Sequence, residues 1–66
     1  MQIIMKSGPD TEQNARRICA HLEAVGSPAS VKNGTGLVVI HTEDMRWQTI
    51  ISVRAMPGIE RIVTGS

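Results

Sequence analysis

The chain has 66 residues, fewer than the roughly 100 to 200 of an ordinary domain, so we expect a single domain over residues 1–66. Seven Lys and Arg against six Asp and Glu give a formal net charge of +1, without the basic excess of a nucleic-acid-binding surface. The one cysteine cannot form an intramolecular disulfide, and neither a signal peptide nor a membrane-spanning apolar run is visible. These properties predict a cytoplasmic protein without a membrane or nucleic-acid partner.

The first half of the chain contains a strand and a helix. Residues 1–6 form a short run rich in Ile and Met, and the loop formers of residues 7–10 end it. Asp10 or Thr11 can cap the helix that follows, and Gln13 is placed to complete a capping box with Asp10. Gly26 is expected to end this helix. Its buried stripe, at spacings of three and four residues, is predicted to contain Ala15, Ile18, Cys19, Leu22 and Val25.

The second half repeats this order with one additional strand. A weak strand over residues 29–32 leads into Asn33-Gly34, a dipeptide typical of tight hairpin turns. The β-branched run at residues 37–41 predicts a central strand. Capping side chains at residues 42–44 then introduce a helix over residues 45–55, with Trp47 in its apolar stripe as a core or interface residue. In the last strand, residues 59–63, alternation places Ile59, Arg61 and Val63 on one face.

The resulting order, βαββαβ, predicts an α+β fold of one architecture. Right-handed crossovers over each helix give a four-stranded antiparallel sheet with both helices on one face. This arrangement is the ferredoxin-like sandwich.

Several segments give the chain a resemblance to a known family. They resemble the small ferredoxin-like, ACT-like domain that precedes the barrel in many DAHP synthases. The segments are residues 1–13 (MQIIMKSGPDTEQ), Val31-Lys32-Asn33-Gly34, residues 37–40 and residues 56–63 (MPGIERIV). The resemblance implies a non-catalytic, allosteric regulatory domain that self-associates and responds to aromatic amino acids at contacts between copies. A fainter similarity, over residues 36–63, is to the chaperones of periplasmic nitrate reductase, which bind a signal peptide.

An amino-acid effector of such a domain needs backbone donors and one or two charges. The first loop and the hairpin supply both, and the expected ligand-binding residues are Lys6, Ser7, Gly8, Ser30, Lys32 and Asn33. Catalysis and metal binding are not expected, and neither is a cofactor. Cys19 and His21 lie on different faces of their helix, and the two expected central strands contain no aromatic residue on which RNA bases could stack.

The expected uncovered face of the sheet is the strongest sign of a partner. The two central strands are apolar in both phases, whereas a sheet covered on one side alternates apolar and polar residues. A large exposed apolar patch usually marks an interaction site, so we expect self-association or a protein partner there. Pairing at the edge of residues 59–63 is a second route. The expected interface residues are Ile4, Leu37, Val39, Ile59, Arg61 and Val63. The alternative to the sensor is therefore a stand-alone protein-binding module, an adaptor or inhibitor.

Overall fold

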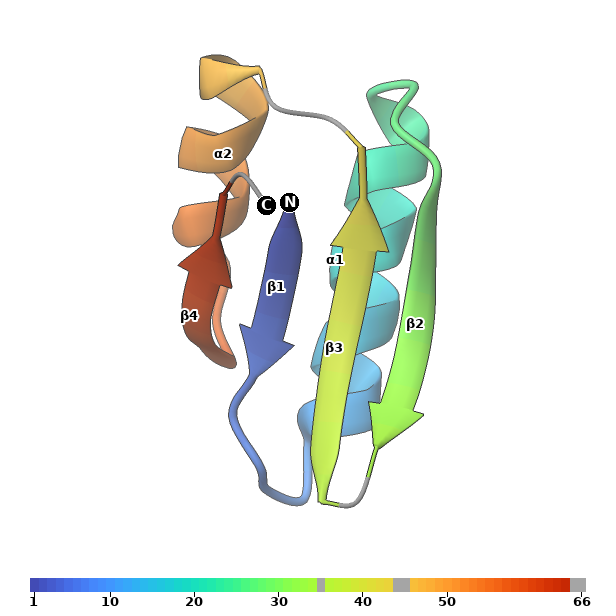
Figure 1. The fold of residues 1–66 in the computed structure, drawn as a ribbon, viewed down its shortest axis with the longest axis vertical. Coiled ribbons are helices and arrows are strands. Elements are labelled where there is room, and N and C mark those ends of the chain that lie inside the picture. The colour runs from blue at the N-terminus through green and yellow to red at the C-terminus, as the bar shows by residue number, and fades with distance from the viewer. Residues whose placement is uncertain (35, 44–45, 65–66) are drawn as a thin grey trace.

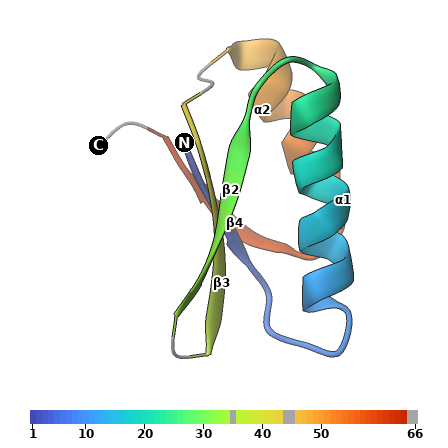
Figure 2. The ribbon, with the colours of Figure 1, turned by 90° about the vertical axis from the view of Figure 1, so that its right-hand side faces the viewer.

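The computed structural model describes residues 1–34, 36–43 and 46–64, and it has the ferredoxin-like architecture expected from the sequence. Its elements run in the order βαββαβ, and the strands form one antiparallel sheet in the order β2-β3-β1-β4 (Figure 1). The elements are β1 (Gln2–Met5), α1 (Thr11–Ala24), β2 (Ala29–Gly34), β3 (Leu37–Thr42), α2 (Trp47–Arg54) and β4 (Ile59–Val63). Both helices lie on the same side of the sheet, and the other face is left open (Figure 2).

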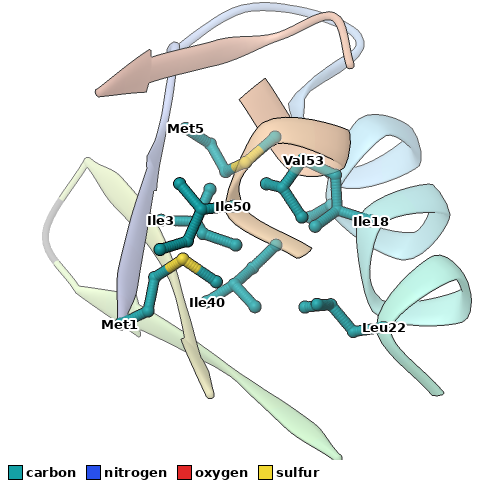
Figure 3. Packing of buried hydrophobic residues seen from close by; sticks show 9 residues of the cluster. Met1, Ile3, Met5, Ile18, Leu22, Ile40, Ile50 and Val53 are labelled. Atoms are coloured by element: carbon teal, nitrogen blue, oxygen red, sulfur yellow. The ribbon is translucent and has the colours of Figure 1, made fainter. Parts of the chain in front are cut away.

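The core lies between the sheet and the two helices. Ile3 and Met5 of β1 and Ile40 of β3 are buried against Ile18 of α1 and Val53 of α2 (Figure 3). The expected stripe of α1 is confirmed at Ala15, Ile18 and Leu22, which are buried, and at Cys19, which is half-buried and packs against the core. Val25 differs, because the helix ends before it and its side chain is 40% exposed.

The first helix begins without the expected capping box. Asp10 occupies the N-cap position, but its backbone (φ −102°, ψ 8°) is not extended and its side chain makes no cap hydrogen bond. Instead, the Thr11 hydroxyl lies 2.6 Å from the carbonyl oxygen of Lys6 and 2.9 Å from that of Gly8. The Thr11 side chain therefore connects the first turn of the helix to the preceding loop. At the other end, Gly26 has φ +80° and terminates the helix as expected.

The second strand extends beyond the position at which the sequence predicts a turn. Asn33 and Gly34, the expected turn dipeptide, are still in β2, where they pair with Val38 and Leu37, respectively. Gly36, directly before β3, has a left-handed backbone conformation, with φ +77°, which favours glycine.

The second helix is shorter than predicted. It begins at Trp47, after Arg46 in extended conformation, and it ends at Arg54. The predicted first residue, at position 45, lies outside the described residues. Thr42 does not cap it, because this residue belongs to β3 and its hydroxyl donates to the Pro28 carbonyl oxygen at 3.1 Å. The predicted cap at Asp44 lies outside the described residues. Thr49, Ile50 and Val53 form the buried side of the helix.

A β-bulge changes the phase of the last strand. Ile4 pairs with Arg61, but the next residue, Met5, pairs with Ile59, so Glu60 is an extra residue in β4. Ile59 and Ile62 therefore both pack against the core, although strict alternation would separate them. The prediction that Ile59 shares a face with Arg61 is wrong for this reason.

Candidate interaction surface

The open face of the sheet is built around one cross-strand pair of apolar residues. The register places Ile4 of β1 directly opposite Val39 of β3, and both are half-buried. The same row continues to Lys32 of β2 on one side and to Arg61 of β4 on the other. Because directly paired residues share a face, this row across the sheet has an apolar pair at its centre and a cationic side chain at each end.

More apolar surface adjoins this row. Leu37 lies two residues from Val39 on the same strand face and is 51% exposed, and Val63 at the end of β4 is 37% exposed. The next row across the sheet is more polar, and its paired residues are Ser30, His41, Gln2 and Val63. The expectation that the uncovered face has apolar side chains is confirmed.

The charged side chains in the paired rows of this face have one sign. Among the register-paired strand residues on it, the charged side chains are Lys32 and Arg61, and no carboxylate occurs. Both cations lie on outer strands and flank the apolar pair. The surface is therefore suited to a partner whose contact region combines an apolar centre with acidic groups.

The structure brings together five of the six expected interface residues. Ile4, Leu37, Val39, Arg61 and Val63 share the open face, whereas Ile59 packs on the covered face because of the bulge.

The six expected ligand-binding residues are spread over the molecule. The Ser7 hydroxyl donates to the Gly36 carbonyl oxygen at 3.1 Å, which brings the first loop to the hairpin. Ser30, however, pairs with His41 at the other end of the sheet, and Asn33 belongs to the covered face, opposite Val38. Of three grooves that the described residues form, each includes at most one of the six. The effector site stays a prediction.

Groups with catalytic or metal-binding potential are few. Within the described ranges, no three His, Cys, Asp or Glu side chains lie close enough to hold a metal ion. Burial, with a smaller contribution from the carboxylate of Glu23, raises the pKa of the Cys19 thiol, so the reactive thiolate is disfavoured. Nε2 of His21 is buried and has no hydrogen-bond partner among the described atoms.

A groove between α2 and β4 is a feature that the sequence did not predict. Its volume is about 690 Å³, and both elements line it, with Ile50, Ile59 and Ile62 among its apolar residues. Trp47, expected in the apolar stripe of the helix, is 67% exposed at this groove. The signal available from the sequence was weak, since Trp47 precedes Ile50 and Val53 at helical spacing and looks like a core residue.

Neither helix of the described chain has the length and apolar character needed to cross a membrane. No family model matches the chain, and no curated protein matches it. The function must therefore be argued from the fold and from these surfaces.

Proposed function

We propose that this chain is a non-catalytic interaction domain that binds another protein through the open face of its sheet. The observation that carries the proposal is the row of Lys32, Val39, Ile4 and Arg61, an apolar pair between two cations. Burial of Leu37 and of the central pair would supply most of the binding free energy. The flanking cations would select a partner with acidic groups around its contact.

The charges favour a different protein over a second copy of this chain. In a face-to-face pair related by a two-fold axis, Lys32 and Arg61 of one copy approach the same cations of the other. Like charges brought together in a contact that excludes water are unfavourable, and this face has no paired carboxylate that could neutralise them. The geometry therefore supports the protein-binding module over self-association through this face.

Site-specific photo-crosslinking in the native host tests this proposal. A photoreactive residue replaces Leu37 on the open face in one version and Arg17, which is exposed on α1, in the other. We expect a defined adduct with another protein from position 37 only, and its loss when Val39→Lys is added. Circular dichroism must show that the fold is retained. The same adduct from both positions, or its survival in the Val39→Lys protein, would refute the proposal.

A second candidate is the effector-sensing function that the resemblance to the DAHP synthase domain implies. The hydrogen bond between Ser7 and Gly36 favours it, because it joins the two segments expected to hold an amino acid. Calorimetric titration with phenylalanine, tyrosine and tryptophan tests it directly. Absence of heat at millimolar concentrations would exclude these amino acids as effectors.

A further inference from the structure

The groove between α2 and β4 lies beside an unpaired edge of the sheet. In the order β2-β3-β1-β4, the last strand has β1 on one side and no strand of the described chain on the other (Figure 1). An edge strand exposes backbone N–H and C=O groups that can pair with an added strand. β4 contains no proline, which would have blocked such pairing.

The lining of the groove restricts what such a strand can contain. Trp47 and Ile50 of α2 face it together with Ile62 of β4, so it offers apolar contacts next to the free edge. Among its charged side chains, Lys6, Arg54 and Arg61 are cationic, and Glu60 is the single acidic one. An incoming segment therefore meets some apolar side chains and a net positive charge.

We propose that β4 and this groove bind an extended segment of another protein in which acidic and apolar side chains alternate. The segment adds a fifth strand outside β4, which satisfies the exposed backbone groups. Successive side chains of a strand point to opposite sides. Its apolar residues therefore enter the groove on the side of α2, while its carboxylates lie on the open side of the sheet, where Arg61 of β4 lies. This site is distinct from the apolar pair of the open face but shares Arg61 with that face.

Trp47 provides a direct readout, because it is the only tryptophan of the chain and lies in the groove. The probe is a synthetic nine-residue peptide without aromatic residues, in which Glu alternates with Val. We expect a saturable change in the emission of Trp47 on titration. A matched peptide with Lys in place of each Glu should give no change. A version in which every backbone nitrogen is methylated should also fail, since it has no donors for strand pairing.

Protein variants locate the site. Arg61→Glu should weaken binding of the Glu peptide about tenfold, because it exchanges an attractive charge for a repulsive one. Lys6→Glu, at the same groove, is a second variant in case the first one unfolds. Arg17→Glu makes the same change of charge on the exposed side of α1 and should leave the affinity unaltered.

Four results would overturn the proposal. The first is an emission that stays constant up to millimolar Glu peptide. The second and third are equal binding of the Lys peptide and equal binding of the N-methylated peptide. The fourth is a loss of affinity in Val39→Lys as large as that in Arg61→Glu. The last result would place the peptide on the open face.

Discussion

Gly58, at the entrance to β4, is the glycine whose replacement should cost the most stability. Its backbone has φ +85°, in the left-handed region, and a Cβ atom added there would lie 2.5 Å from Nδ2, 2.9 Å from Cγ and 3.0 Å from Cβ of Asn14. The backbone conformation alone costs an alanine about 1–2 kcal/mol. Overpacking against α1 adds about 1–3 kcal/mol. We therefore expect Gly58→Ala to lower the free energy of unfolding by about 2–5 kcal/mol.

Two further variants separate the backbone contribution from the steric one. Gly26 has nearly the same conformation, with φ +80°, but a Cβ atom added there meets nothing within 4 Å. Gly26→Ala should therefore show the backbone cost alone. Asn14→Ala removes the two closest atoms, so Gly58→Ala should be less damaging in that background, with a coupling free energy of about 1 kcal/mol or more.

Urea denaturation followed by circular dichroism measures all of these variants. The solution should contain sulfate, which strengthens apolar burial, because a domain of this size has only about 3–5 kcal/mol of stability. If Gly58→Ala and Gly26→Ala cost the same, or if Asn14→Ala leaves the cost of Gly58→Ala unchanged, the close approach of α1 to Gly58 is not what constrains this position.

Three other side chains give further tests of stability. Arg46 Nη2 donates to the buried Ser27 hydroxyl at 3.0 Å, so Arg46→Ala should lower the unfolding free energy by about 1 kcal/mol in urea titrations. Burial raises the pKa of the Cys19 thiol, so the contribution of this thiol to stability is constant below its ordinary value of 9.0 and falls as the pH rises above it, because the unfolded chain then ionises first. Cys19→Ala should therefore make the loss of stability above this pH smaller. Ile40 is fully buried, and Ile40→Ala should cost about 2–5 kcal/mol in thermal unfolding, whereas Val31→Ala, at its 44% exposed cross-strand partner, should cost less than about 1 kcal/mol. An equal loss at Val31 and Ile40 would contradict the description of the core.

The fold was predictable from the sequence because the hydrophobic periods were unambiguous. The spacing of Ala15, Ile18 and Leu22 allowed only a helix with one buried side, and the β-branched run of β3 allowed only a strand. The boundaries were less predictable, since they depend on hydrogen bonds that compete locally. The hydroxyl of Thr11 donates to the preceding loop, and that of Thr42 donates to Pro28. Neither threonine therefore caps a helix in the way that the sequence pattern predicts.

The candidate surfaces were also predictable only in part. The apolar character of Ile4, Leu37 and Val39 was visible in the sequence, because both phases of the central strands are apolar. The groove was not visible, because it depends on how α2 lies against the edge strand. The exposure of Trp47, the first residue of α2, was not visible either, because its spacing to Ile50 and Val53 is that of a core residue.

The bulge at Glu60 determines which charges face a partner. Without the extra residue, Ile59 would share the open face with Arg61, and the edge of that face would be more apolar. With it, Ile59 turns to the core, and Arg61 is both the cation next to Ile4 and a lining residue of the groove. The two surfaces therefore meet at one positive charge. Because Lys32, Arg54 and Arg61 give both surfaces the same sign, a partner that spans them needs acidic groups throughout, and electrostatic selection acts on the two sites together.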